Sequence, residues 1–413
     1  MMARRLLLLS YWFPPNNVIG ASRAAAMARY FSDNGWAVTV VAANSGAVSR
    51  DFEVDLSAIE VHRVEDTPVT KFMNFKSGRA RWRRALSALA RYAAFPDAFR
   101  STTRRMGTVA EQLMHDGKTF DVIMSTALPF SQHEVAGKLA RKFGALLVLD
   151  NRDTWAYSAY RRRLPLSDGL ERRYEHRVLS AGDMLTTISD GMRSYFCKQY
   201  PDLEPRFSTI RNGADADIVS GRTSQRSSGS ELHIVYTGIL YGAKRDIRPI
   251  LNAARDSGFQ VAFDFFGSEP DRVAALKANY PTLRVTDYGR VPRAEAIAAQ
   301  RSADALLVGL GQDPAEKTFL PGKFFEYVGT GRPIIVIADP DYEISQLVDA
   351  HGLGVATRDA DLLNAFLGRL SRGEIVPREV VPEALTRDHQ LGLLERCIDS
   401  ALEKHKRRAR PSS

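Results

Sequence analysis

Two charged residues, Lys323 and Glu326, interrupt the apolar first half of the segment PGKFFEYVGTGRPIIVI, residues 321–337. Lys323 and Glu326 are three positions apart, so they share one face if the segment is helical. The first turn of such a helix offers free N–H groups and a cation to phosphate, and a carboxylate one turn later suits the diol of a ribose. The pattern predicts a binding site for a nucleoside diphosphate. A local salt bridge, contributing roughly a few tenths of a kcal/mol, is the structural alternative.

Two loops that follow predicted strands also combine glycine with cations. YTGILYGAKRDIRP contains Gly238, Lys244 and Arg245, and cations beside free N–H groups suit a diphosphate. YWFPPNNVIGASR places Gly20 before a helix and Arg23 in its first turn, so a phosphate can approach the backbone. For either loop, an ordinary strand–helix connection is the structural alternative. A complete G-x-G-x-x-G is absent, which argues against a nicotinamide-dinucleotide site.

Three more polar residues follow strands of the N-terminal half. His133 begins a helix in PFSQHEVAG, where it either faces a ligand or is an ordinary helix histidine. Arg152 and Asp153 follow the strand LLVLDN, either at a ligand-facing end or as a buried structural ion pair. Asp-x-Asp spacings at 215–217 and 339–341 fall outside the loops assigned to diphosphate, so no metal site is predicted.

The scaffold that must position these loops is predicted by the strand pattern. Apolar strand-like runs alternate with helical patterns throughout, which is typical of βαβ units in a parallel, doubly wound sheet. The chain of 413 residues is long for a single core. We therefore expect an α/β protein with two Rossmann-like doubly wound domains facing each other across a cleft, with ligands at the carboxyl ends of the strands.

Shifts in composition set the expected domain boundaries. We expect an N-terminal domain over residues 1–217 and a C-terminal domain over 231–380. Residues 218–230 are polar and rich in Gly and Ser, which indicates a linker or flexible loop. Residues 381–413 resemble an amphipathic helix with a basic, frayed end, and we expect this helix to pack back on the N-terminal domain.

The overall composition excludes several classes of protein. A hydrophobic fraction of 44% and a charged fraction of 25% are globular values. Only two cysteines occur, so neither a disulfide framework nor a cysteine-based zinc site is expected, and a cytoplasmic setting fits. The opening MMARRLLLLSYWFPPNN mimics a signal peptide, but a buried first strand explains it better. No segment reaches the roughly 20 apolar residues of a spanning helix.

A net charge of +9 favours anionic partners, or serves solubility alone. Residues 71–106 are densely basic with interleaved aromatic residues, so they could lie on an anionic membrane surface. A solvated helix that covers the sheet is the alternative. Nucleic acid is not an expected partner, because the charge is diffuse and no recognition module is visible.

An ordered set of segments resembles a known family. The chain resembles a GT-B glycosyltransferase, similar to glycosyltransferase family 4 and, more narrowly, to its bacterial cell-surface polysaccharide branch. The segments that carry the resemblance, in order, are SYWFPPNNVIGASR, LPFSQHEVAGKLARKFGALLVLDNRDTW, GDMLTTISDGM, IRNGAD, YTGILYGAKRDIRPIL, YGRVPRAEAIAAQRSADALLVGL and PGKFFEYVGTGRPIIVI. They span nearly the whole chain outside residues 45–118 and the linker.

The resemblance implies roles for individual residues. Glu326 matches the second Glu of the family's Glu-x7-Glu motif, which holds the ribose, and Lys244 matches the lysine of its diphosphate loop. The first Glu of the motif falls at Thr318, and Ile239 replaces a frequent arginine for which Arg245 is a substitute. The other implied contacts to donor phosphates, sugar or base, or to the acceptor, are Gly20, His133, Gly238, Gly289, Arg290, Val291, Gly322 and Lys323.

The implied activity is that of a retaining hexosyltransferase. It moves a sugar from a nucleotide diphosphate sugar to a hydroxyl of a saccharide or lipid-linked acceptor in cell-surface polysaccharide synthesis, at the cytoplasmic face of the membrane. Lys244, Arg245 and the helix start at Gly322 would stabilise the leaving diphosphate without metal or other cofactor. The alternatives are a nucleotide-sugar 2-epimerase of the same fold and a degenerate, non-catalytic nucleotide-sugar-binding protein.

Overall fold

The computed structural model describes residues 3–46, 52, 54–73, 94–156, 168–215, 231–240 and 245–409. The chain divides into two compact units. Unit 1 comprises Met1–Ile188, Met192–Ile210 and Leu391–Ser413, and unit 2 comprises Ser189–Gly191 and Arg211–Gln390. Lys244, the expected linker at 218–230 and most of the basic, aromatic segment at 71–106 lie outside the described residues.

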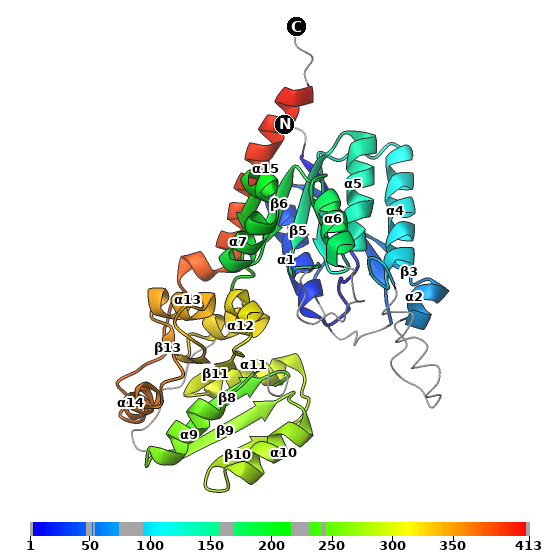
Figure 1. The fold of residues 1–413 in the computed structure, drawn as a ribbon. Coiled ribbons are helices and arrows are strands. Elements are labelled where there is room, and N and C mark those ends of the chain that lie inside the picture. Colours follow the sequence, from blue (N-terminus) through cyan, green and yellow to red (C-terminus); the bar gives the residue numbers. More distant parts are fainter. Residues whose placement is uncertain are drawn as a thin grey trace. The chain divides into compact units, whose positions relative to one another are not determined.

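Unit 1 alternates strands with helices, as the sequence predicts (Figure 1). Its elements are β1 (Arg5–Ser10), α1 (Ile19–Asp33), β2 (Ala37–Asn44), β3 (Glu60–Glu65), α2 (Pro68–Met73), α4 (Arg100–His115), β4 (Val122–Ala127), α5 (Ser131–Phe143), β5 (Leu146–Asn151), α6 (Asp168–Leu179), β6 (Met184–Thr187), α7 (Asp190–Gln199), the 3-10 helix η1 (Pro201–Arg206) and β7 (Phe207–Thr209).

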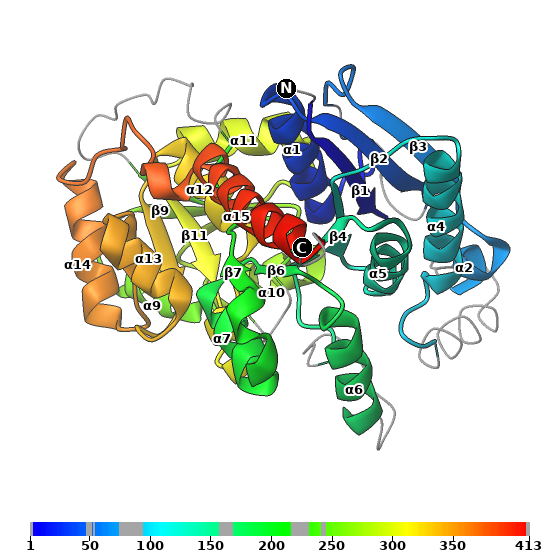
Figure 2. The same cartoon turned by 90° about the horizontal axis from the view of Figure 1, so that it is seen from above.

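The sheet of unit 1 has seven parallel strands in the order β3-β2-β1-β4-β5-β6-β7. Its central strands are apolar at consecutive positions because helices cover both faces. Helices α4, α5, α6 and α7 supply the core of one face. The other face packs against α1 and α15 (Arg387–Ala409), which the turned view in Figure 2 shows on one side of the sheet.

Unit 2 repeats this architecture. Its elements are β8 (Leu232–Thr237), α9 (Arg248–Asp256), β9 (Val261–Phe266), α10 (Pro270–Asn279), β10 (Arg284–Asp287), α11 (Arg293–Ser302), β11 (Ala305–Gly309), η3 (Pro314–Thr318), α12 (Gly322–Thr330), β12 (Ile334–Ile337), α13 (Glu343–His351), β13 (Gly354–Ala356), α14 (Ala360–Ser371) and η4 (Glu383–Leu385). The strands form a six-stranded parallel sheet in the order β10-β9-β8-β11-β12-β13. The predicted α/β class with two doubly wound Rossmann-like domains is confirmed.

Glycines end two helices that matter for the site. Gly331 caps α12 with φ +69°, and Gly144 caps α5 with φ +71°. Both lie in the left-handed region that glycine adopts without steric strain. Pro333 follows Gly331 and β12 begins directly after it, so the boundaries of α12 agree with those that the sequence predicts.

Helix α15 joins unit 1 through a narrow apolar stripe. Leu391, Leu394, Ile398 and Leu402 are buried in the core of unit 1, and their spacing of three or four residues places them on one helical face. The Glu395 carboxylate accepts hydrogen bonds from Trp36 Nε1 at 2.8 Å and from the Tyr30 hydroxyl at 3.2 Å.

Candidate functional site

The strand order of unit 2 reverses between β8 and β11. In open α/β sheets, ligands bind at the carboxyl edge where neighbouring strands send their connections in opposite directions. The chain leaves β8 through Gly238 and reaches α9 after Arg245, and it leaves β11 through a loop that ends at the start of α12. This edge therefore brings together the glycine loop, Arg245 and the first turn of α12.

Gly238 places the β8 loop beside α12. Its φ of +91° is one that side-chain-bearing residues rarely adopt, and its N–H donates to the Phe266 carbonyl at 2.7 Å. A Cβ added to Gly238 would lie 3.6 Å from Lys323 Nζ. The sequence-predicted partners Gly238 and Lys323 are thus neighbours.

Lys323 directs its ammonium group inward. Nζ is enclosed and lies 3.6 Å from the centroid of the Tyr236 ring, and among the described residues it makes no hydrogen bond. Burial, reinforced by the charge of Arg245, holds the pKa of Lys323 well below its ordinary value, while Glu326 opposes this shift. An anion bound beside Nζ would relieve this destabilisation of the charged form.

Arg245 is the second cation of this edge. Its side chain is buried, and its guanidinium carbon lies 5.2 Å from the centroid of the Phe319 ring, in the loop before α12. Two like charges held together in a buried place disfavour each other, so a negatively charged ligand is the natural complement. Lys244, the other cation predicted here, lies outside the described residues.

Glu326 pairs with a cation from another helix. Its Oε1 lies 3.2 Å from Arg293 Nη2 on α11, and the same Nη2 lies 3.9 Å from the Asp215 carboxylate. The Glu326 side chain is 34% exposed, so its carboxylate remains open to a ligand hydroxyl. The local alternative, a salt bridge from Glu326 to Lys323, is not the contact that the structure forms.

Two residues that the sequence reasoning did not single out attach helices α12 and α11 to the end of β8. The Tyr327 hydroxyl accepts the Thr237 N–H at 2.9 Å and lies 3.1 Å from Thr237 Oγ1. Gln300 on α11 donates through Nε2 to Thr237 Oγ1 at 3.1 Å. In the sequence, a tyrosine on the apolar face of a helix suggests packing alone. Its hydroxyl is the one feature that could have indicated a hydrogen bond, because a buried hydroxyl usually has a partner.

The loop expected to hold the nucleotide base lies beside the same edge. Gly289 has φ +63°, and its carbonyl accepts the Gly267 N–H at 2.5 Å. Tyr288 stacks on Phe266 with ring centroids 4.5 Å apart and an interplanar angle of 2°, and it is 46% exposed. The sequence reasoning missed Tyr288, which offers an exposed ring face. Of the other residues expected in this loop, Arg290 is exposed and Val291 is partly buried.

In unit 1, Arg23 turns inward to a buried carboxylate. Its Nε and Nη2 contact the two oxygens of Asp150 at 3.0 and 2.7 Å, and the hydroxyls of Thr126 and Thr186 each donate to Asp150 at 2.7 Å. Burial opposes ionisation of Asp150, but Arg23 and these hydroxyls outweigh it and lower the pKa of Asp150 to about 2. The geometry gives Arg23 a structural partner.

Gly20 and Arg152 lie against each other at the carboxyl edge of unit 1. A Cβ added to Gly20 would lie 2.1 Å from Arg152 Nη1. Arg152 donates through Nε to the Ala127 carbonyl and through Nη2 to the Leu128 carbonyl at 3.1 Å. Burial raises the pKa of the neighbouring Asp153, against the charge of Arg152. A larger residue at position 20 would therefore displace the Arg152 guanidinium from this position.

His133 is buried beneath this edge. Its Nδ1 lies 2.6 Å from Ser125 Oγ, and its side chain is 1% exposed. Burial lowers the pKa of His133 to about 4, although Asp150 favours the charged form. The imidazole is accordingly neutral near pH 7, and it contacts a serine in the structure.

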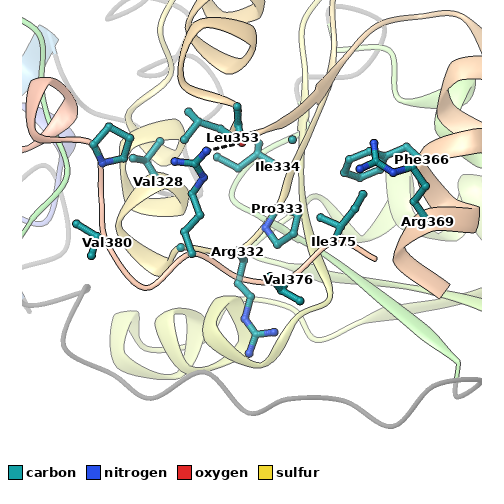
Figure 3. A pocket seen from close by; sticks show the side chains of 15 residues that line it. Val328, Arg332, Pro333, Ile334, Leu353, Phe366, Arg369, Ile375, Val376 and Val380 are labelled. Carbon is teal, nitrogen blue, oxygen red and sulfur yellow. Dashed lines mark hydrogen bonds between the residues drawn. The ribbon is translucent and has the colours of Figure 1, made fainter. Parts of the chain in front are cut away.

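Within the described part of the chain, no group of three or more His, Cys, Asp or Glu side chains could hold a metal ion. A cavity of about 220 Å³ lies at the opposite edge of the unit 2 sheet, where α12 ends and β12 begins. Its lining combines apolar side chains, such as those of Val328, Ile334 and Phe366, with the arginines Arg332 and Arg369 (Figure 3). None of the predicted site residues that the structure describes lines this cavity.

Comparison with known proteins finds one family match, which covers the N-terminal part of the chain. Residues 20–213 match the glycosyl transferase 4-like domain. No curated protein matches the chain in sequence. Among the described residues, no helix combines the length and apolarity that crossing a membrane requires.

Several solved structures share the fold over nearly the whole chain. The apo form of the lipopolysaccharide outer core galactosyltransferase WaaB has a TM-score of 0.60 at 13% identity, covering 96% of this chain and 99% of that one. The catalytic domain of starch synthase IV from Arabidopsis thaliana, bound to ADP and acarbose, has a TM-score of 0.62 at 11% identity, with coverages of 98% and 99%. HepE from Anabaena, in complex with UDP-glucose, has a TM-score of 0.56 at 12% identity and covers 98% of each chain. These likenesses and the domain match confirm the expected GT-B fold and the resemblance to glycosyltransferase family 4.

Proposed function

We propose that this chain, a GT-B protein that resembles glycosyltransferase family 4, is a retaining, metal-independent hexosyltransferase. In this proposal it transfers a sugar from a nucleotide diphosphate sugar to a hydroxyl of a saccharide or lipid-linked acceptor in cell-surface polysaccharide synthesis. The domain match over residues 20–213 and the shared fold support a glycosyltransferase. Structural neighbours in complex with ADP and with UDP-glucose support a nucleotide-sugar donor.

One observation carries the proposal: the enclosed ammonium group of Lys323 beside Gly238 and near the charge of Arg245. The free N–H groups at the start of α12 point toward the same edge of the sheet and favour an anion. A diphosphate placed there would accept hydrogen bonds from Lys323 and from the α12 N-terminus. Glu326, one turn further along α12, is placed to accept the ribose hydroxyls.

The proposed chemistry follows from these contacts. As the glycosidic bond to the diphosphate breaks, negative charge grows on the leaving oxygen, and donors already held in place stabilise it. Lys323, Arg245 and the α12 N-terminus supply this stabilisation, so no metal ion is required in the proposal. In a retaining front-face reaction, the leaving diphosphate oxygen takes the proton of the acceptor hydroxyl, so no protein base is needed. The pKa of His133, which burial lowers to about 4, makes its imidazole a weak base, in agreement with this route.

The test is a thermal-shift screen against UDP, GDP, dTDP and ADP, each with and without magnesium, followed by an assay of nucleoside diphosphate release from the matching sugar donors. We expect one diphosphate to stabilise the protein irrespective of magnesium. Acceptor-dependent release with retention at the anomeric carbon would support the transferase. Conversion of the donor without an acceptor would favour the epimerase, and binding without turnover would favour the non-catalytic binding protein.

A further inference from the structure

A second cationic site lies at the amino edge of the unit 1 sheet, away from the carboxyl edge that holds Gly20 and Arg152. The end of α15 lies beside β6 in both views of the fold, and Figure 2 also shows β7 there (Figures 1 and 2). A cavity of about 190 Å³ separates these elements. Its lining comprises Asp183, Met184, Pro205, Arg206, Ser208, Cys397, Ser400, Ala401, Lys404, His405 and Arg408.

The periodicity of α15 explains why this face is cationic. Cys397, Ala401, Lys404 and Arg408 recur every three or four residues, so they form one helical face adjacent to the apolar stripe that packs on unit 1. Because the apolar stripe packs on unit 1, it sets the orientation of α15 about its own axis. The neighbouring face then lines the cavity. Lys404 and Arg408 are exposed there, and neither forms a salt bridge with a described residue.

Arg206 faces these two cations from the opposite wall. Its Nη1 donates to the carbonyls of Ser180 at 2.8 Å and Gly182 at 2.9 Å. Carbonyl groups therefore hold the guanidinium in place, and no described carboxylate lies within salt-bridge distance of it. The Arg206 guanidinium is therefore held in a fixed place without a carboxylate partner. A cation held in this way can bind an anion from solution.

Two other polar residues of the cavity wall, His405 and Asp183, contact groups of the protein itself. His405 Nε2 lies 3.2 Å from the Gly144 carbonyl, and its Nδ1 lies 3.7 Å from Asp183 Oδ2. Asp183 Oδ2 also accepts the Leu147 N–H at 2.9 Å. The cavity thus holds three permanent cations, Arg206, Lys404 and Arg408, against one carboxylate.

From this arrangement we propose that the cavity binds a phosphate-bearing anion through Arg206, Lys404 and Arg408, with the hydroxyls of Ser208 and Ser400 as further donors. The phosphate belongs either to a lipid headgroup at a membrane surface or to a free phosphate compound, since both present the same charge and acceptor oxygens. The proposal is independent of the donor site in unit 2 and of the transferase activity.

The test compares two full-length variants that each lose three positive charges. The first carries Arg206→Gln, Lys404→Gln and Arg408→Gln. The control carries Arg29→Gln, Arg141→Gln and Lys198→Gln, which replace exposed cations of unit 1 outside the cavity. Non-specific attraction to anions depends on the summed charge and would fall similarly in both variants. Melting curves check that both variants fold as the parent protein does.

Each protein is floated with phosphatidylcholine vesicles, with or without phosphatidylglycerol, and is titrated separately with inorganic phosphate and glycerol phosphate. We expect the cavity variant to lose at least about tenfold in binding and the control to keep it. Binding to phosphatidylglycerol vesicles alone would identify a headgroup, and binding of the free compounds would identify a soluble phosphate ligand.

Equal losses in the two variants, or no binding by the parent protein, would overturn the proposal. A third variant, with Arg81, Arg83 and Arg84 changed to Gln, covers the other basic segment of the chain. If it abolishes vesicle binding while the cavity variant retains it, the membrane contact belongs to residues 71–106, and the cavity proposal fails.

Discussion

The Lys323 Nζ atom lies 3.6 Å from the centre of the Tyr236 ring, with no hydrogen-bond acceptor among the described residues. The ring attracts a cation through its quadrupole, but it cannot replace the hydration that the ammonium group loses on burial. The lowered pKa of Lys323, caused first by burial and then by Arg245, is the electrostatic result. An arrangement that is unfavourable in the free protein is typical of a site organised for a ligand.

Lys323→Met should therefore separate stability from binding. Methionine retains the apolar stem and removes the buried ammonium group, so we expect the free energy of unfolding to rise by on the order of 1 kcal/mol. Affinity for the nucleoside diphosphate should fall roughly tenfold to hundredfold, the range for a lost charge-assisted hydrogen bond. Denaturant titration and calorimetry measure the two effects. Lys277→Met, at an exposed position of α10, is the control and should change neither.

Binding of the diphosphate should be coupled to proton uptake by Lys323. In the free protein the pKa of Lys323 is lowered, and the charge of a bound diphosphate raises it again. Between these two pKa values the complex holds more protons than the free protein, so affinity should fall as pH rises through this window toward the ordinary lysine value of about 10.4. Calorimetry in buffers of different ionisation enthalpy measures the uptake. If the Lys323→Met variant takes up as many protons as the parent protein, the assignment is wrong.

Glu326→Ala tests the proposed ribose contact. We expect diphosphate affinity to fall by about 1.5–3 kcal/mol, the range for a hydrogen bond to a charged group. The fold should remain intact, because Arg293 still has a carboxylate partner in Asp215, which lies 3.9 Å from its Nη2. Glu295→Ala, which removes an exposed carboxylate from α11, should bind as the parent protein does. Unchanged affinity of Glu326→Ala in calorimetry would remove this residue from the site.

The architecture could be predicted from the sequence because the same local patterns, which mark buried strands and helix ends, recur along the chain. Consecutive apolar residues in LLLLS and IIVI indicate strands buried on both faces, and the glycine–proline order after α12 marks its end. Lys323 and Gly238 could each be identified from loop chemistry. Their contact, and the burial of Nζ against Tyr236, depend on the distance between β8 and α12, which no local pattern contains.

Arg23 shows a second limit of reading the sequence. Its place in the first turn of α1, after a glycine, left a role with a ligand and a structural role both open, and the structure pairs its side chain with Asp150. A signal was available in the strand LLVLDN, where Asp150 occupies a position as buried as its apolar neighbours. A buried carboxylate requires a cationic or hydrogen-bonded partner. From this requirement, Arg23 could have been predicted to point toward the core of unit 1.

Asp150→Asn should strongly destabilise unit 1, because it leaves the Arg23 guanidinium buried without its bidentate counter-ion. Breaking a buried ion pair from one side costs about 3–5 kcal/mol, and we expect the free energy of unfolding to fall by that order. The Asp150 pKa is lowered from 3.8 to about 2, so its stabilisation is fully present above the unfolded value and is lost as pH falls toward 2. Urea titrations across this acid range should show a steeper loss in the parent protein than in Asp150→Asn. Asp33→Asn, at an exposed position of α1, is the matched control. Parallel pH profiles for the parent protein and Asp150→Asn would show that the ion pair does not contribute to stability in this way.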